Sequence, residues 1–172
     1  MGLGVETNPT GGWRVVLDGR ELAVGRANAY KPYIHPLNTL AGDCLTVDAP
    51  WDHTWHRGLY FAWKYLAGAN AWGEGDEEPS RRSARARVVS ERAAAMDDGA
   101  QVNYEIAWEA LAPDEPLLAE TRTLRFWLPT GSPGYYGLDW SARFTAQTRV
   151  ELERSTPVDA KRGGYAGLSW RP

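Results

Sequence analysis

The sequence predicts an all-β fold, an antiparallel β-sandwich. Four segments in its second half alternate apolar and polar residues with the period of two that half-buried strands show. Their connections are short and rich in turn residues, as at Asp97-Asp98-Gly99, so we expect consecutive strands to be antiparallel neighbours. The only rival for a helix, residues 82–96, carries a β-branched pair that disfavours it. The four segments are residues 85–91, 101–110, 117–128 and 140–152.

A tight hairpin is predicted near the start of the chain. Residues 13–17 and 20–24 are short β-prone runs on either side of Asp18-Gly19. This dipeptide is typical of two-residue hairpin turns, because both turn positions need positive φ. The two runs should therefore pair directly with each other.

The next part of the chain is predicted to be less regular. Residues 25–42 should be irregular, with Lys31 and His35 held toward extended backbone because each precedes a proline. We expect a short strand over residues 44–47. Residues 59–65 are aromatic and β-prone, and should form a buried strand.

Polar residues interrupt the β pattern in two places. Residues 73–82 are rich in charge, which favours a solvated loop. Glu120 and Arg122 lie among the apolar residues of one strand face, so they form either a buried ion pair or part of a site. Residues 161–172 resemble the start of a further strand, so we expect an unfinished sheet and a chain that is truncated at its C-terminus.

Composition narrows the class of protein. A chain of 172 residues fits a single domain spanning residues 1–172. A net charge of −3 argues against a nucleic-acid partner, and the apolar runs are shorter than the roughly 20 residues that cross a bilayer. No signal peptide is evident at the N-terminus, so we expect a cytoplasmic protein with no membrane partner. The lone Cys44 excludes an internal disulfide and is expected to be a buried thiol.

All three histidines of the chain lie in one aromatic stretch, residues 30–74. His35, His53 and His56 suit general acid–base catalysis, because an imidazole titrates near neutral pH. Three neutral imidazoles could instead bind a divalent metal ion. A third interpretation is that they make local hydrogen bonds within the fold. Clustering on predicted loops favours a functional site.

The same stretch supplies other candidate site residues. Asp52 and Arg57 flank the histidine pair, in a segment bracketed by proline and glycine that favours a turn over a helix. Trp72 is the best candidate for a wall that stacks on a sugar ring. Glu74 is either an acid or base, or a solvated loop carboxylate.

Four motifs together resemble the PmoA-like family of bacterial proteins, over residue 13 to the end of the chain. The resemblance implies a β-rich fold similar to the galactose-mutarotase supersandwich, incomplete in this chain, and a context of sugar-acting enzymes. We discount the methane oxidation suggested by the family's automatic label, because the chain has no apolar spanning segment. The motifs are residues 31–37, 52–58, 72–74 and 163–168.

The leading hypothesis is a soluble carbohydrate-active or carbohydrate-binding protein that needs no cofactor and binds a small sugar or glycoside. Whether it is an enzyme stays open; a mutarotase-like, epimerising or glycoside-modifying reaction would suit the residues. The expected acid and base groups are His35, His53, His56 and Glu74. The expected substrate contacts are Lys31, Tyr33, Asp52, Arg57, Trp72, Glu120 and Arg122.

Two alternatives use the same stretch. In the first, His35, His53 and His56 hold a divalent metal ion in an enzyme such as an oxygenase. In the second, the protein is a non-catalytic sugar-binding module. The leading and metal hypotheses both predict that the three histidines converge on one concavity.

Overall fold

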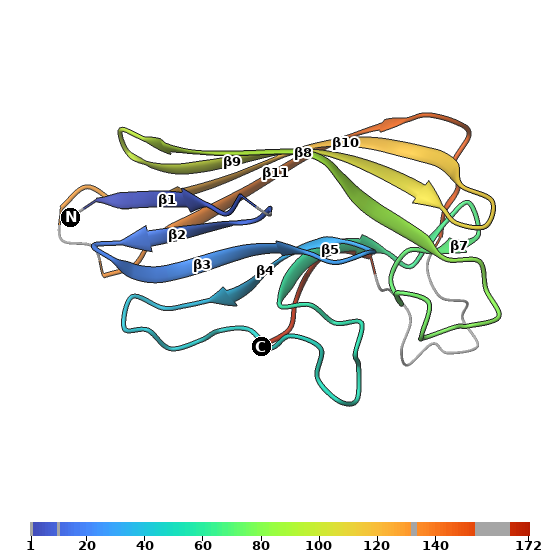
Figure 1. The fold of residues 1–172 in the computed structure, drawn as a ribbon, viewed down its shortest axis with the longest axis horizontal. Helices are drawn as coiled ribbons and strands as arrows, with labels where there is room; N and C mark the ends of the chain where they lie inside the picture. Colours follow the sequence, from blue (N-terminus) through green and yellow to red (C-terminus); the bar gives the residue numbers. More distant parts are fainter. Residues whose placement is uncertain (1, 10, 132–133, 154–165) are drawn as a thin grey trace.

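Two antiparallel β-sheets lie face to face in the computed structural model, which describes residues 2–9, 11–131, 134–153 and 166–172 (Figure 1). The strands of these residues are β1 (Leu3–Thr7), β2 (Trp13–Leu17), β3 (Arg20–Ala27), β4 (Pro32–Leu37), β5 (Leu59–Trp63), β6 (Tyr65–Leu66), β7 (Ala69–Asn70), β8 (Ala84–Met96), β9 (Gly99–Ala110), β10 (Glu115–Trp127), β11 (Gly137–Ala146), β12 (Leu152–Glu153) and β13 (Ala166–Trp170).

The larger sheet of the described chain has six strands in the order β1-β2-β3-β4-β5-β13. The second has four strands in the order β11-β10-β9-β8, and a small third sheet has the order β12-β6-β7. Every pairing between these strands is antiparallel, which confirms the predicted sandwich class. We call the first two the six-stranded and the four-stranded sheet.

The predicted hairpin joins β2 to β3. Asp18 and Gly19 have φ values of 48° and 82°, the left-handed conformation that a two-residue turn of this kind requires. Trp13 of β2 lies opposite Gly25 of β3, and a Cβ at Gly25 would lie 2.1 Å from the indole ring. A glycine there gives the indole space to pack on the backbone.

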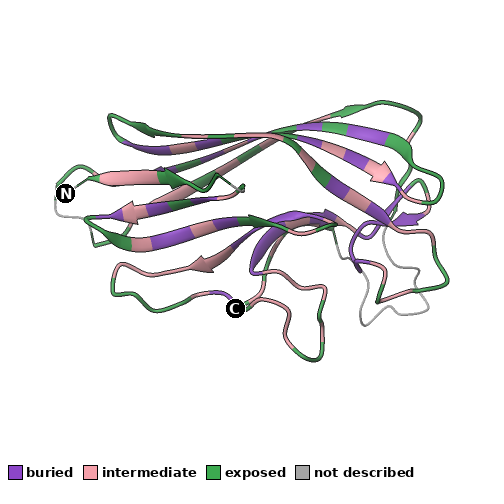
Figure 2. Ribbon diagram, in the orientation of Figure 1, coloured by how far each residue is buried: buried purple, intermediate pink, exposed green. Residues whose placement is uncertain are grey.

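The four-stranded sheet follows the alternating pattern of the sequence. Along β9, Val102, Tyr104, Ile106 and Trp108 are all buried, as predicted. They face the inner side chains of the six-stranded sheet, such as Val15, in one continuous hydrophobic core. Figure 2 shows buried and exposed residues alternating along these strands.

Proline-rich residues 25–42 are more regular than we predicted. β3 continues to Ala27, and β4 occupies Pro32–Leu37. Pro32 is the first residue of its strand, where the missing N–H group is tolerated. Pairing of β4 with β5 is short, joining Tyr33 to Tyr60 and Ile34 to Leu59. The prediction of an irregular segment is therefore wrong for β4.

Three predicted strands differ from the structure. Residues 44–47 form no strand and contribute only an isolated bridge from Cys44 to Asn38. The aromatic strand of residues 59–65 is interrupted at Lys64, beyond which β6 turns into a hairpin with β7. The strand predicted over 140–152 ends at Ala146, because its ladder with β10 ends there. β1 was not predicted and pairs with β2 throughout.

The final strand, β13, pairs with β5 and confirms a strand near the C-terminus. Residues 154–165, which include the glycine pair of the last family motif, lie outside the described residues. Leu168 and Trp170 are 53% and 57% exposed on this edge strand.

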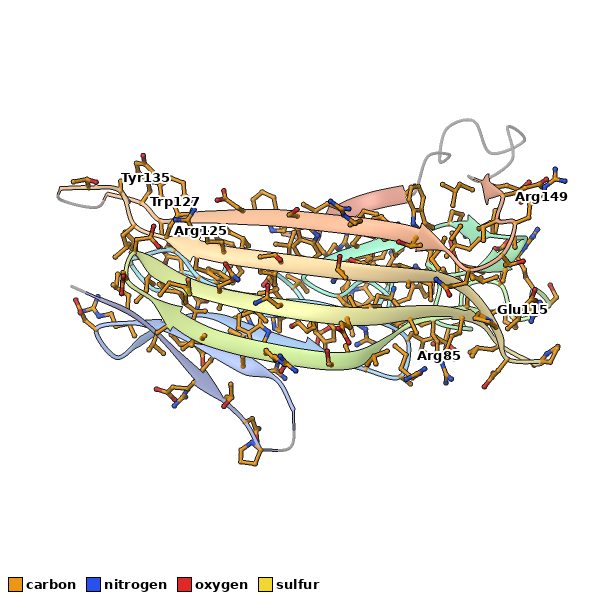
Figure 3. All side chains as sticks on the ribbon, turned by 90° about the horizontal axis from the view of Figure 1, so that it is seen from above. Arg85, Glu115, Arg125, Trp127, Tyr135 and Arg149 are labelled. Carbon is orange, nitrogen blue, oxygen red and sulfur yellow. The ribbon has the colours of Figure 1, made fainter. Side chains whose placement is uncertain are left out.

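The outer face of the four-stranded sheet is polar and exposed (Figure 3). Arg85 and Glu115 lie toward one end of the sheet, and Arg125, Trp127 and Tyr135 lie toward the other. In the described part of the chain, no helix is long and apolar enough to span a membrane.

Candidate functional site

The candidate site lies on the outer face of the six-stranded sheet, over β4 and β5. Tyr33 and Tyr60 are direct partners in the ladder, so their side chains share one face, while Ile34 joins the core on the other. Buried Trp72 belongs to the same cluster, with its ring centre 5.4 Å from that of Tyr60, and Trp55 packs against the cluster. Figure 1 shows the connection between β4 and β5 on the side of this sheet that faces away from the four-stranded sheet.

A buried lysine lies at the base of this cluster. The Lys31 side chain is 1% exposed, and its Nζ lies 3.3 Å from Oε1 of Glu74. Nζ also donates hydrogen bonds to the backbone oxygens of Trp72, at 2.7 Å, and Trp55, at 3.2 Å. It lies 4.7 Å from the centre of the Tyr60 ring. Burial lowers the pKa of Lys31 to about 8, against the opposing effect of the Glu74 carboxylate.

Arg57 extends this charge network toward solvent. Its Nη2 donates to Oε2 of Glu74 at 2.7 Å, and its Nη1 lies 3.3 Å from Oδ1 of Asp48. Asn28 donates a further bond to Oε1 of Glu74, at 3.0 Å. The bond to Glu74 raises the pKa of Arg57, so the guanidinium stays charged. Glu74 therefore joins three segments that are far apart in the sequence.

Two asparagine side chains shape the backbone of this network. Asn28 Oδ1 accepts hydrogen bonds from the backbone N–H groups of Tyr30 and Lys31, which fixes the turn into β4. Asn70 Oδ1 accepts bonds from the N–H groups of Trp72 and Gly73 in the same way. Each turn places the side chain that follows it against the sheet.

The histidine pair lies in a folded-back loop between Asp48 and Arg57, which form an isolated bridge. Within the loop, the His53 N–H donates to the oxygen of Pro50 at 3.0 Å, and the His56 N–H donates to the oxygen of His53 at 2.9 Å. These are consecutive turns, which agrees with the prediction of a turn over a helix. The two imidazoles stack, with ring centres 4.8 Å apart.

Gly58 closes the loop where it returns to β5. Its φ is 53°, and a Cβ there would lie 2.3 Å from the backbone oxygen of Ile34. A larger residue at this position would push the loop away from β4. The position of the histidine pair over the sheet therefore depends on this glycine.

His56 opens onto a cavity of about 260 Å³ beside the end of the chain. The Trp72 indole meets the imidazole edge to face, with ring centres 5.8 Å apart and an angle of 89°. Burial lowers the pKa of His56 to about 4, and repulsion from His53 adds to this, so the imidazole is neutral at neutral pH. The cavity is lined by His56, Tyr60, Trp72, Ser169, Trp170, Arg171 and Pro172. We call it the His56 cavity.

His35 is held in a different environment from the stacked pair. Its Nδ1 lies 2.9 Å from Oγ1 of Thr46, and its nearest charges are Asp48 and Arg26. Burial lowers the pKa of His35. Within the described residues, no group of three or more His, Cys, Asp or Glu side chains could hold a metal ion. The three histidines therefore do not form the metal-ligand set of the alternative hypothesis.

Asp52 and Tyr33 lie at the two sides of the network. Asp52 Oδ2 lies 3.0 Å from Nδ1 of His53 and 3.4 Å from Nη2 of Arg171. The contact with His53 is the main cause that lowers the pKa of Asp52. Tyr33 donates a hydrogen bond to Oδ2 of Asp48 at 3.4 Å, and burial raises its pKa.

Glu120 and Arg122 lie inside the sandwich and form the buried ion pair that was one of their two predicted roles. Arg122 Nε donates to Oε1 of Glu120 at 2.6 Å, and the indole N–H of Trp108 donates to Oε2 at 2.8 Å. The Arg122 guanidinium lies 4.6 Å from the Trp140 ring centre. Both side chains face the core between the sheets, so they do not contribute to the outer-face site.

Other expectations for this stretch also change. Glu74 is only 7% exposed, so it is not the solvated carboxylate that a charged loop suggested. Cys44 is exposed, with its Sγ donating to the oxygen of Thr46, and the expected buried thiol is wrong. Trp63 packs on the core, whereas Trp51 is 93% exposed.

Sequence reasoning did not single out Tyr60, Asp48 or Arg171 as site residues. Tyr60 carried no usable signal, because every residue of its strand is apolar or aromatic and the sequence does not separate the two faces. No sequence pattern indicated Arg171 as a site residue. Its position depends on backbone hydrogen bonds with Val47 and Gly58, which are far from it in the sequence.

Fold and geometry together define an all-β protein with a loop-covered cavity on one outer sheet face. The chain belongs to a family of unknown function, DUF6807, whose family model matches residues 14–172. Comparisons with curated proteins and with solved structures give no match.

Proposed function

We propose that this protein binds a small sugar or glycoside in the His56 cavity and acts on it by acid–base chemistry. One observation carries the proposal. A neutral imidazole, that of His56, lies against the indole of Trp72 in a cavity of about 260 Å³. Aromatic walls suit the C–H faces of a sugar ring, and an uncharged imidazole can exchange a proton with a hydroxyl group.

The charge network below the cavity supports a positioning role for its members. Lys31, Arg57 and Glu74 already satisfy one another, so Glu74 is no longer a good candidate for an acid or base. We assign these three residues to holding Trp72 and the histidine loop in place. His56 remains the acid–base candidate, with His53 stacked behind it beside Asp52.

In the proposed reaction, Nε2 or Nδ1 of His56 takes the proton of a sugar hydroxyl as the base. As the bond from the anomeric carbon to the ring oxygen breaks, the ring oxygen takes a proton from the imidazolium so formed or from water. The open-chain aldehyde then recloses on its other face by the reverse transfers, which completes a mutarotation. The resemblance to PmoA-like proteins and to the galactose-mutarotase supersandwich favours this class of reaction. No bound cofactor is required for it, and the cytoplasmic location stays a prediction.

The binding step is tested by filling the cavity. Ser169 lines it and Ser141 is an exposed serine on β11, so Ser169→Trp and Ser141→Trp form a matched pair. Titration with a panel of monosaccharides and methyl glycosides should show binding to the wild type and to Ser141→Trp. Ser169→Trp should lose affinity by about tenfold or more, because the indole occupies the space of the ring. Equal affinity in both variants would contradict the proposal, as would the absence of any bound sugar.

The catalytic step is tested separately with His56→Gln, which keeps a polar side chain at the position. NMR exchange measurements on the bound sugar should show conversion by the wild type. The variant should be slower by about 10²–10⁴-fold, the usual contribution of an acid–base group, with little change in affinity. A wild type that binds sugar and converts none of them would instead support the non-catalytic sugar-binding module.

A further inference from the structure

A second and larger cavity lies on the same outer face of the six-stranded sheet. Its volume is about 740 Å³, and it lies over β1, β2, β3 and the start of β4. Most of its side chains are polar, and the proposed function does not use them. The lining residues that matter here are Glu6, Arg14, Glu21, Val24, Arg26 and Tyr33. We call it the Arg14 cavity.

Strand register connects the two cavities. Glu6 pairs with Arg14, and Arg14 pairs with Val24, so these three side chains share one face of β1, β2 and β3. Arg26 follows Val24 on the same face and pairs with Tyr33.

The same row continues into the His56 cavity. Tyr33 pairs with Tyr60, and Tyr60 pairs with Ser169 of β13. One row of residues on this face therefore crosses all six strands, and its middle members, Tyr33 and Tyr60, lie buried beneath the loops at 8% and 1% exposed. With neighbouring strands about 4.8 Å apart, the row is about 24 Å long, which is several times the width of one sugar ring.

Tyr33 is the shared element between the cavities. It lines the Arg14 cavity, and it packs with Tyr60 and Trp72, which line the His56 cavity. Arg57 and Asp48 lie over Tyr33, with side chains 20% and 23% exposed. A ligand that passes from one cavity to the other would meet these polar groups at the surface.

Charge in the Arg14 cavity indicates the chemistry of its ligand. Two arginines and two glutamates line it, so the charges balance. Arg14 is paired to Glu6 at 2.6 Å, and Arg26 donates to the backbone oxygen of His35 at 2.7 Å. A phosphorylated or acidic ligand would find no excess of positive charge here. A neutral chain rich in hydroxyl groups can bond to both kinds of side chain.

We propose that the ligand of this protein is a neutral oligosaccharide or a long glycoside that spans the outer face of the six-stranded sheet, passing over Arg57 and Asp48 between the two cavities. One terminal sugar occupies the His56 cavity, and the following sugars occupy the Arg14 cavity. This rests on the proposed function, because the His56 cavity must bind the terminal sugar.

The test compares neutral oligosaccharides of increasing length with the corresponding monosaccharide. Wild-type affinity should rise with length by about tenfold or more, because a second group of contacts is added to the first. Val24→Trp fills the Arg14 cavity, and Arg14→Ala removes a polar contact from it. Both variants should bind the monosaccharide within about twofold of the wild type, since they lie far from the His56 cavity.

The variants then separate this inference from the proposed function. For long ligands, Val24→Trp should lower affinity to the level of the monosaccharide, Arg14→Ala should lower it by a smaller factor, and Ser141→Trp should change nothing. Thermal melting checks that each variant is folded. Affinity that is independent of length, or unaffected by Val24→Trp, would overturn the extended ligand while leaving the His56 cavity intact. Failure of every sugar, short or long, to bind the wild type would overturn both proposals.

Discussion

The outer faces of the two sheets differ in what covers them. On the four-stranded sheet, Arg87 pairs with Glu109 at 2.5 Å and Arg125 pairs with Asp98, and both arginines are nearly half exposed. On the six-stranded sheet, loops cover β4 and β5, and the side chains of Lys31 and Glu74 are 1% and 5% exposed. Both faces carry exposed ion pairs, such as Arg14 with Glu6 on the six-stranded sheet, but among the described residues the loops over β4 and β5 remove the Lys31–Glu74 pair from water.

This difference shows where the loops, rather than the strands, build the candidate site. Exposed pairs contribute little because water screens them, whereas a buried charge needs its partner to offset the loss of hydration. On the six-stranded sheet, the loops that bury Glu74 also bring His56 and Trp72 over the strands. The buried network therefore holds the loops around the His56 cavity in place. The exposed ion pairs on the four-stranded sheet do not position a loop in this way.

The largest expected effect comes from removing one carboxylate from each face. Glu74→Ala leaves Lys31 with a buried, uncompensated charge and takes one of the two carboxylate partners of Arg57, and should lower the free energy of unfolding by about 3–5 kcal/mol. Asp98→Ala removes the partner of exposed Arg125, and should lower it by about 1 kcal/mol or less. Urea denaturation of both variants measures the difference. Similar losses in the two variants would mean that the faces do not differ in the way described.

A second expectation concerns the pH range over which each face loses stability. The pKa of His56 falls from 6.5 in the unfolded chain to about 4 in the folded protein. The unfolded state therefore binds the proton first, and stability should decrease as pH falls from about 6.5 to about 4. Arg87 lowers the pKa of Glu109 below its ordinary value of 4.5, so the stability from this group should be lost only below about pH 4.5.

Urea titrations between pH 7.5 and pH 3.5 can distinguish these two windows. His56→Gln should reduce the pH dependence above about pH 4.5, where Glu109 is mostly ionised in both states, and should leave the part that the lowered pKa of His35 contributes. Glu109→Gln should leave that range unchanged and reduce the loss below it. A His56→Gln variant with the wild-type slope in the upper range would show that this imidazole is not held neutral by burial.

Much of the fold follows from local pattern. The alternation in β9 and β10 and the Asp18-Gly19 turn depend on near neighbours, so they could be predicted. β4 could not, because its two prolines signal irregular backbone and only pairing with β3 and β5 makes it a strand. The end of β11 could not be predicted either, because β11 ends where its pairing with β10 ends.

The position of the charge network and of the histidine pair was predictable, but the contacts of their residues were not. The stretch from Lys31 to Glu74 does contain the charge network and the histidine pair. Glu74 was predicted as a possible acid or base, but it forms buried ion pairs with Lys31 and Arg57. Residue spacing along the sequence cannot show these contacts. Alternation placed Glu120 and Arg122 on the apolar face of β10, but it could not decide between a buried ion pair and a site, because their contacts with each other and with Trp108 depend on the tertiary fold.

The smallest expected effect is the response of the two kinds of ion pair to salt. Double-mutant cycles on Arg125 with Asp98 should give a coupling of about 0.2–1 kcal/mol at low salt. Raising salt to about 1 M shortens the screening distance to about 3 Å, so this coupling should fall toward zero. The cycle on Arg57 with Glu74 should keep most of its coupling, because the Glu74 side chain is only 5% exposed and ions cannot enter between the two groups. Loss of both couplings in salt would show that solvent reaches Glu74, and that the loops do not separate the two faces as the structure implies.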